Sequence, residues 1–363
     1  MNVLILTGHF GWGHVSAAEA IRDEILEKHE DAQVEIVDMF AYLSPELSKG
    51  MYSLFNFWTR YTPQLYNRLN AVSCHMKSVP LDRATSRKID TLLTEKKIDL
   101  VISTLPYCSQ CMSTYKKIHK STLPLYTYIT DIVAHEEWVA PQTDGYFVGA
   151  DSTKECLVAH GVDPRAIVVC GIPVRRAFHA AEKTVTPAER PEIVIMGGGL
   201  GLIPASETFL VTLAEQDQAH VTIITGKNAK LKKRLKEQYP QFEVVGFTRH
   251  TEKYLKRATV LVTKSGGITT FEAINTQTPL FILKPFLAQE VGNAAFIEQE
   301  GIGVVQWQLD RFLAHRILSL ATNPARLKTI SQRMAALKAT WDSGSCLRDQ
   351  NALTEERLAE QCA

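Results

Sequence analysis

Short apolar runs alternate with longer amphipathic stretches along almost the whole chain. In the first half, six runs fit buried strands and the first is followed by a helical pattern over 15–29; the runs cover 2–6, 34–40, 99–104, 124–130, 145–150 and 166–171. A second series covers 191–199, 220–226, 242–247, 259–267 and 279–285. Strands separated by helices need crossover connections, so each half is predicted to form a parallel sheet with helices on both faces.

A polar segment with three prolines, 173–191, separates the two series and is typical of an interdomain linker. The pattern therefore predicts an α/β protein with two doubly wound, Rossmann-like domains and a cleft at the carboxyl ends of the sheets. We expect a first domain over 1–172, a linker over 173–190 and a second domain over 191–335. We expect helices over 336–363 to return to the first domain.

Composition narrows the class of protein without changing this picture. The 363 residues are 45% hydrophobic and 22% charged, as in globular proteins, and a net charge of +1 argues against a nucleic-acid binder. No run reaches the roughly 18 apolar residues of a membrane-spanning helix, and a strand follows Met1 almost at once, so we expect a cytoplasmic protein without a signal peptide. Cys108 and Cys111 form a lone C-x-x-C, which we interpret as buried or loop thiols rather than a zinc or redox site.

Two glycine-rich turns in the second half are candidate phosphate sites. Residues 194–205, "VIMGGGLGLIPA", indicate a strand, a glycine loop with Gly198 and Gly199, and the start of a helix, although a plain turn is an equal alternative. A second turn, Lys264 to Gly267, includes Gly266 and precedes a predicted helix.

Polar side chains after the second turn suit a nucleotide sugar. Thr269 and Glu272 fall in the first turns of that helix, where a carboxylate can accept hydrogen bonds from ribose hydroxyls. Gln289, Glu290 and Asn293 offer the donors and acceptors that sugar hydroxyls require. A helix cap at 269–272 and a polar loop at 288–293 are the structural alternatives.

The segment 47–81 has an unusual composition that bears on a lipid partner. It has no Asp or Glu, and it carries four basic residues together with six aromatic residues between positions 52 and 66; its candidate membrane contacts are Phe55, Trp58, Arg60, Tyr61 and Arg68. Aromatic and basic side chains without acids suit an anionic membrane interface, and an aromatic core helix with a solvated basic edge is the alternative. The lysine-rich stretch 227–236 is either a solvated face or a second contact with the membrane.

Several motifs together resemble one enzyme family. Lys264–Ala273 matches K-[SP]-G-G-x-T-x-x-E-A and Pro285–Asn293 matches P-x-x-x-Q-E-x-x-N, while 8–21, 128–139 and 152–178 match in order. The chain resembles the glycosyltransferases that make glycolipids from UDP-sugars, namely monogalactosyldiacylglycerol synthases and processive diacylglycerol glucosyltransferases. Peptidoglycan N-acetylglucosaminyltransferases are more distantly similar. The resemblance implies the GT-B fold, in which the second Rossmann-like domain binds the UDP-sugar and C-terminal helices return to the first.

The resemblance also implies roles for donor-site residues. Glu272 corresponds to the ribose-binding carboxylate, Gly246 and Phe247 to the segment that reads uracil, and Gln289 and Glu290 to contacts with the donor hexose. Arg175 resembles the arginine that neutralises the diphosphate, a suitable task for a fixed-charge guanidinium. No pair of aspartates has the D-x-D spacing of metal-dependent glycosyltransferases, so we expect no metal cofactor.

In the first half the resemblance marks His14, Asp131, His135 and Trp138, and we expect His135 and Trp138 on the acceptor or membrane side of the site. An acceptor hydroxyl attacks well only when a base takes its proton, and a histidine does this best near neutral pH. His14 is our first candidate for the base, with Asp131 either its orienting partner or the alternative base. Trp12 departs from the family and is expected in the acceptor pocket, whereas the family pattern does not fix His9.

These observations predict an inverting transfer of a hexose, glucose favoured over galactose, from its UDP carrier to the hydroxyl of diacylglycerol. The enzyme would act at the inner face of the membrane, as a peripheral protein, and form a β-linked glycolipid. Transfer of N-acetylglucosamine to a lipid-linked cell-wall precursor, a UDP-sugar epimerase and a non-catalytic UDP-sugar sensor are the alternatives.

Overall fold

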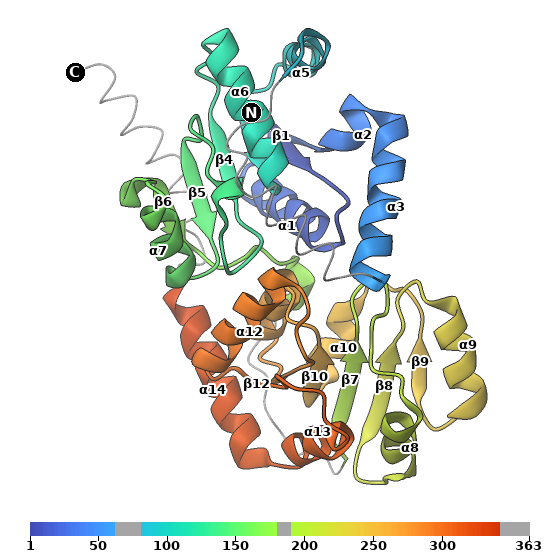
Figure 1. Cartoon of the computed structure of the whole chain (residues 1–363). Coiled ribbons are helices and arrows are strands. Elements are labelled where there is room, and N and C mark those ends of the chain that lie inside the picture. Colours follow the sequence, from blue (N-terminus) through green and yellow to red (C-terminus); the bar gives the residue numbers. More distant parts are fainter. Residues whose placement is uncertain (62–80, 180–189, 342–363) are drawn as a thin grey trace. The chain divides into compact units, whose positions relative to one another are not determined.

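The computed structural model describes residues 1–61, 81–179 and 190–341 (Figure 1). The chain divides into two compact units, the first made of Met1–Arg176 with Trp341–Ala363 and the second of Ala177–Thr340. Each unit contains a six-stranded parallel sheet with helices on both faces, so the predicted α/β architecture is confirmed. Within the described parts, none of the helices is long and apolar enough to cross a bilayer.

The sheet of the first unit has the order β2-β1-β3-β4-β5-β6. Its strands are β1 (Asn2–Thr7), β2 (Gln33–Asp38), β3 (Leu100–Ser103), β4 (Leu125–Tyr128), β5 (Gly145–Val148) and β6 (Ile167–Val169). Its helices include α1 (Gly13–Lys28), α2 (Met39–Leu43), α3 (Pro45–Tyr61), α5 (Arg83–Glu95), α6 (Pro106–His119) and α7 (Asp151–Ala159). All six strands correspond to apolar runs in the sequence.

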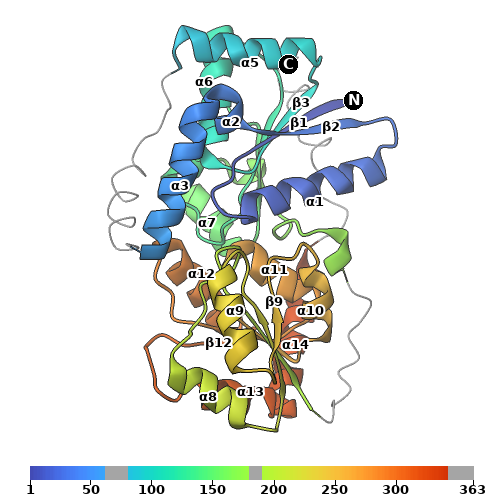
Figure 2. The same ribbon diagram turned by 90° about the vertical axis from the view of Figure 1, so that its right-hand side faces the viewer.

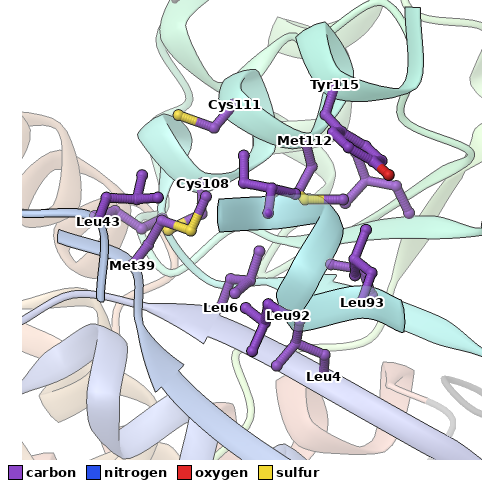
Figure 3. Close-up of a cluster of buried hydrophobic side chains, with 14 residues drawn as sticks. Leu4, Leu6, Met39, Leu43, Leu92, Leu93, Cys108, Cys111, Met112 and Tyr115 are labelled. Atoms are coloured by element: carbon purple, nitrogen blue, oxygen red, sulfur yellow. The ribbon is translucent and has the colours of Figure 1, made fainter. Parts of the chain in front are cut away.

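The core of the first unit has two layers, one on each face of the sheet. Val3 and Ile5 pack with Ile21 and Ile25 of α1, while Leu4 and Leu6 point to the opposite face. On that face they meet α2, α5 and α6, as the close-up in Figure 3 shows. Alternation along β1 therefore places α1 on one side of the strands and α2 and α6 on the other (Figure 2).

The two cysteines of the C-x-x-C pair lie in this core, on α6 (Figure 3). Burial raises the pKa of the Cys108 thiol well above its usual value and that of Cys111 to about 12. A thiol that stays protonated is a poor nucleophile and metal ligand. Both residues are packing residues, which confirms the prediction.

The sheet of the second unit has the order β12-β11-β10-β7-β8-β9. Its strands are β7 (Glu192–Met196), β8 (His220–Ile224), β9 (Glu243–Val245), β10 (Val260–Thr263), β11 (Leu280–Ile282) and β12 (Gly303–Val305). Its helices are α8 (Glu207–Glu215), α9 (Ala229–Gln238), α10 (Thr251–Arg257), α11 (Gly267–Asn275), α12 (Ala288–Gln299), α13 (Leu313–Ala321) and α14 (Pro324–Thr340). Strand β12 was not predicted, because three residues with one glycine give no readable period.

Two predicted segments fall largely outside the described residues. These are the linker, of which 180–189 is not described, and the C-terminal helices, of which 342–363 are not described. Trp341, directly after α14, belongs to the first unit and is buried. A side-chain carbon on Gly171 would lie only 2.8 Å from the indole of Trp341, so this position needs a glycine.

Candidate active site

His14 lies at the start of α1, directly after the loop that leaves β1. Gly11, with a φ of +85°, allows the turn before it. Nδ1 of His14 lies 2.9 Å from the Thr104 carbonyl oxygen and 2.8 Å from Oγ1 of Thr130. A backbone carbonyl only accepts, so Nδ1 carries the proton and donates it, and Nε2 of the neutral ring is left as a proton acceptor.

The electrostatics of His14 favour the neutral ring. Burial lowers the pKa of His14, while the Asp131 carboxylate and the Thr104 carbonyl act in the opposite direction. The lowered pKa keeps the imidazole unprotonated at neutral pH, the form that takes a proton from a hydroxyl. Asp131 follows β4 closely and provides the negative charge that would stabilise the imidazolium.

Trp138 lies beside this histidine, at the end of a 3₁₀ turn over Glu136–Trp138. The Trp138 side chain is 1% exposed, and its ring centroid lies 6.5 Å from that of His14. Such burial is incompatible with contact to a membrane, so this part of the prediction for Trp138 is corrected to packing near His14, and its role in the acceptor pocket stays a prediction. His135 is the residue before the turn and is partly exposed.

A second histidine of the same loop, His9, belongs to a polar cluster. Its Nδ1 lies 2.5 Å from Oδ2 of Asp38, the last residue of β2. The Tyr52 hydroxyl of α3 donates to Asp38 over 2.7 Å, and the backbone N–H of Ala41 donates over 3.0 Å. The Asp38 carboxylate thus links three parts of the first unit, namely the loop after β1, the first turn of α2, and α3.

The aromatic residues of α3 divide between packing and exposure. Phe55 meets Phe10 of the loop edge to face at 5.4 Å, so it packs within the unit and does not project as a membrane contact would. Trp12 is partly exposed, with its ring 6.4 Å from that of His9, and Trp58 is partly buried. Four large apolar side chains of α3 are exposed: Leu47, Met51, Leu54 and Phe57. The side chains of Arg60 and Tyr61, and the whole of Arg68, lie outside the described residues.

The first glycine loop of the second unit folds back on itself. The N–H groups of Gly201 and Leu202 donate to the carbonyls of Gly198 and Gly197, each over 3.0 Å. Gly198 and Gly201 have positive φ values of 67° and 64°. Helix α8 starts only at Glu207, so the predicted direct passage from glycine loop to helix is wrong: a tight loop and an extended segment intervene.

The second turn brings several predicted donor residues together. Lys264 reaches from the end of β10 to Glu290 of α12, with Nζ 3.0 Å from Oε1. A side-chain carbon on Gly198 would lie 3.4 Å from Cε of Lys264, so the lysine stem passes over the first glycine loop. Asn293 donates to the Ser265 carbonyl over 2.9 Å, which ties α12 to the turn. The segment 288–293 is therefore helical and is not a polar loop.

Helix α11 begins with an N-terminus suited to an anion. Gly266 caps it without a side-chain hydrogen bond, and Gly267 is its first residue. Thr269 is partly exposed in this first turn, and Glu272 is 6% exposed one turn later. N–H groups at a helix start favour phosphate, while a carboxylate further along is better suited to hydroxyl groups.

The remaining donor-site predictions lie on two other segments. Gly246 and Phe247 follow β9, and Phe247 is exposed with Lys227 Nζ 5.7 Å from its ring centre. Gln289 is partly exposed on the first turn of α12. Arg175 belongs to the first unit, whereas the other predicted donor residues belong to the second.

Comparisons with known proteins agree with this division. Residues 14–174 match the family model of monogalactosyldiacylglycerol (MGDG) synthase, and residues 192–361 match that of the glycosyltransferase family 28 C-terminal domain. Each unit thus carries the signature of one half of a glycosyltransferase. The chain therefore resembles an MGDG synthase over its first unit and a family 28 glycosyltransferase over its second.

Curated proteins that resemble this chain align with nearly its full length. A processive diacylglycerol beta-glucosyltransferase of Staphylococcus carnosus is 27% identical over 96% of this chain and 92% of its own. An enzyme of the same name from Bacillus licheniformis is 25% identical over 96% of this chain and 94% of its own.

Solved structures show the GT-B fold predicted for the family. MurG of Acinetobacter baumannii matches with a TM-score of 0.59 and 14% identity, covering 97% of this chain and 98% of its own. Medicago truncatula UGT71G1, solved with UDP-glucose, matches with a TM-score of 0.63 and 11% identity, covering 98% of each chain. A UDP-GlcNAc 2-epimerase of Neisseria meningitidis matches with a TM-score of 0.59 and 12% identity, covering 97% of this chain and 100% of its own. At such identities the likeness shows the fold alone.

Three residues that contact His14 or His9 are not predicted from the sequence. Thr104 contacts His14 through its backbone carbonyl, which side-chain patterns cannot reveal. Thr130 directly precedes Asp131, in a segment that carries the family resemblance. Its hydroxyl could therefore have been predicted from the sequence as a partner of His14. Asp38 is the last residue of β2, which pairs with β1. Its contact with His9 depends on the register of the two strands, which places Asp38 opposite Thr7, two positions before His9.

Proposed function

We propose that this protein is an inverting UDP-hexose:diacylglycerol glycosyltransferase, with glucose as the favoured hexose. The proposal rests first on His14, whose Nδ1 is held by Thr104 and Thr130 and whose Nε2 is left to accept a proton. The curated relatives support it further, because those aligned over nearly the whole chain are named diacylglycerol beta-glucosyltransferases.

In the proposed reaction, Nε2 of His14 takes the proton of the diacylglycerol hydroxyl as its oxygen attacks the anomeric carbon. The new bond from carbon to the acceptor oxygen forms on the face opposite UDP, and the bond to the diphosphate oxygen breaks. Inversion at that carbon gives a β-linked glycolipid and UDP. The Asp131 charge stabilises the resulting imidazolium, since this carboxylate raises the pKa of His14.

Negative charge develops on the diphosphate as UDP leaves. We assign its stabilisation to Arg175, to Lys264 and to the uncapped N–H groups at the start of α11. Glu272 binds the ribose, Gly246 and Phe247 read the uracil, and Gln289 contacts the hexose. In this scheme no step needs a metal ion.

Product analysis tests the reaction directly. Purified protein is incubated with UDP-glucose, UDP-galactose or UDP-N-acetylglucosamine, with and without diacylglycerol, and products are identified by mass. We expect diacylglycerol-dependent UDP release with a hexosyl-diacylglycerol product, greatest with UDP-glucose. Conversion of a UDP-sugar without lipid would favour the epimerase, and binding without turnover would favour the sensor.

The exposed side of α3 supports docking to a membrane. Leu47, Met51, Leu54 and Phe57 recur every three or four residues and are 68%, 41%, 44% and 53% exposed. An exposed apolar stripe on an amphipathic helix suits the boundary between headgroups and acyl chains. We assign peripheral membrane attachment to this stripe, assisted by basic residues of 47–81.

Vesicle sedimentation tests the attachment. Wild-type protein should sediment with vesicles that contain anionic lipid at low salt, and Leu54→Glu should reduce the bound fraction several-fold. Leu26→Glu is the matched control, because Leu26 is also exposed but lies on α1. Equal loss of binding in both variants would remove α3 as the docking surface.

A further inference from the structure

A groove on the second unit has no part in the reaction described above. It has a volume of about 570 Å³ and is lined by strand β12, the end of α12 and one face of α14 (Figure 1). All of its lining residues lie within 298–333 and belong to the second unit. The predicted donor residues Lys264, Glu272 and Gln289 are not among them. The groove is therefore a candidate site for a different partner.

One wall of the groove is the edge of a sheet. Among the described strands, only β11 pairs with β12. Ile302 and Gln306, which flank β12, form backbone hydrogen bonds with β11. In a parallel ladder every second residue faces the same neighbour, so Gly303 and Val305 direct their N–H and C=O groups away from β11. Both residues line the groove, and an extended segment laid beside β12 can pair with these four groups.

The facing helix α14 adds two positive charges. Arg326, Thr329, Ile330 and Arg333 have the i, i+3, i+4, i+7 spacing of one helix face, and all four line the groove. A side-chain carbon at Gly301, whose φ is +62°, would overlap Nη1 of Arg333, so the glycine leaves room for this guanidinium. Within the part of the chain that the structure describes, neither guanidinium has a hydrogen bond or an ion pair. Both are available to a ligand.

The charge of the groove decides between partners. Its lining has two arginines and one acidic residue, Glu298, whose two carboxylate oxygens each accept from Nε1 of Trp307 over 3.1 Å. If the edge of β12 paired with β12 of a second copy, the arginines of both copies would face each other and repel. A segment with acidic side chains complements the same edge.

We infer that the groove between β12 and α14 binds an extended acidic segment of a partner protein, which adds a strand to the sheet beside β12. The backbone of this segment pairs with Gly303 and Val305, and its acidic side chains, at alternate positions, bind Arg326 and Arg333. A free phosphate is less suited to the groove, because the outward carbonyls of β12 would face its charge. The inference goes beyond the proposed function and does not depend on it.

Fluorescence anisotropy with three synthetic peptides tests the inference on the full chain. The probe is a fluorescein-labelled hexapeptide of alternating valine and glutamate, and we expect it to bind at low salt. The same peptide with glutamine in place of glutamate should bind about tenfold more weakly, because it lacks the charges. A version of the acidic peptide that is N-methylated at every residue donates no backbone hydrogen bonds and should bind about fivefold more weakly. Equal binding of the acidic peptide and its N-methylated version would overturn strand addition.

Arginine variants locate the binding. Arg326→Gln and Arg333→Gln should each raise the Kd of the acidic peptide about threefold, as for loss of one ion pair. Lys328→Gln is the matched control, because it removes the same charge from an exposed position of α14 that does not line the groove. Its Kd should stay within about 1.5-fold of wild type. Equal weakening in all three variants would overturn the site, because the net charge of the protein would then explain binding.

Val305→Pro tests the backbone pairing from the side of the protein. The N–H of Val305 faces away from β11, so proline removes one donor to the peptide and leaves the pairing with β11 in place. We expect the Kd of the acidic peptide to rise about fivefold or more, with a thermal unfolding temperature close to that of wild type. Unchanged binding in Val305→Pro, or no binding of the acidic peptide by wild type, would overturn the inference.

Discussion

The two units each begin with a strand followed by a glycine loop, yet the two loops differ in what they present. After β1 the loop reaches α1 at Gly13, and His14 in the first turn of that helix is fixed by contacts to Thr104 and Thr130. After β7 the loop closes through its own hydrogen bonds, and α8 begins only at Glu207. In the second unit the charged groups instead come from the ends of other strands, at Lys264 and in α12.

This difference shows that equal topology does not imply equal chemistry. In the first unit, a short loop brings a histidine to the carboxyl end of the sheet. In the second unit, the glycine loop lies under the Lys264 side chain, and the helix start without a side-chain cap belongs to α11. We propose that the first unit activates the acceptor and the second binds the donor, and variants in each unit test that division.

Glu272→Ala should have the largest effect on donor binding. Loss of a carboxylate that accepts from ribose hydroxyls is expected to raise the KM for UDP-glucose roughly 10- to 100-fold, with a smaller change in kcat. Glu207→Ala, at the exposed start of α8, is the control and should match wild type. Initial rates at varied UDP-glucose measure both constants, and an unchanged KM in Glu272→Ala would refute its role.

Lys264→Met should have a smaller effect, which we expect mainly on kcat. The lysine charge is held near the glycine loop by Glu290, and its loss should lower kcat about tenfold because the leaving diphosphate is less stabilised. Lys264→Arg keeps the charge and should recover much of the rate. If Met and Arg variants were equally impaired, packing and not charge would explain the loss.

Asp131→Asn should shift the pH dependence of kcat/KM. The Asp131 charge raises the pKa of His14, so its removal lowers that pKa further and moves the acidic limb of kcat/KM to lower pH. The rate at neutral pH should fall, because the imidazolium formed during the reaction loses its counter-charge. Loss of the acidic limb altogether would identify Asp131 as the base instead of His14.

Chelation should have the smallest effect. If Arg175, Lys264 and α11 stabilise the leaving group, activity in excess EDTA should stay within about twofold of the untreated enzyme. Abolition of activity that magnesium or manganese restores would contradict this part of the account.

The sequence was sufficient for the architecture because both sheets are parallel and buried. Strands such as β1 and β10 are nearly continuous apolar runs, and amphipathic helices separate them. Strand β12 was missed because it is three residues long and includes Gly303. The late start of α8 was missed because hydrogen bonds within the loop cannot be seen in residue types.

The candidate site was predictable where side chains carry the signal. Glycines with positive φ and the charged pair of Lys264 and Glu290 stand in recognisable segments. The orientation of His14 was not predictable, because it depends on a backbone carbonyl 90 positions away. The burial of Trp138 was likewise hidden, since a tryptophan is equally suited to a core and to a membrane surface.

The central claim is that His14 activates the acceptor without contributing to donor binding. His14→Ala should lower diacylglycerol-dependent UDP release roughly 10²- to 10⁴-fold, as for loss of a general base, while calorimetry shows UDP binding within about twofold of wild type. Unchanged turnover in His14→Ala, or an equal loss of UDP binding, would contradict the account.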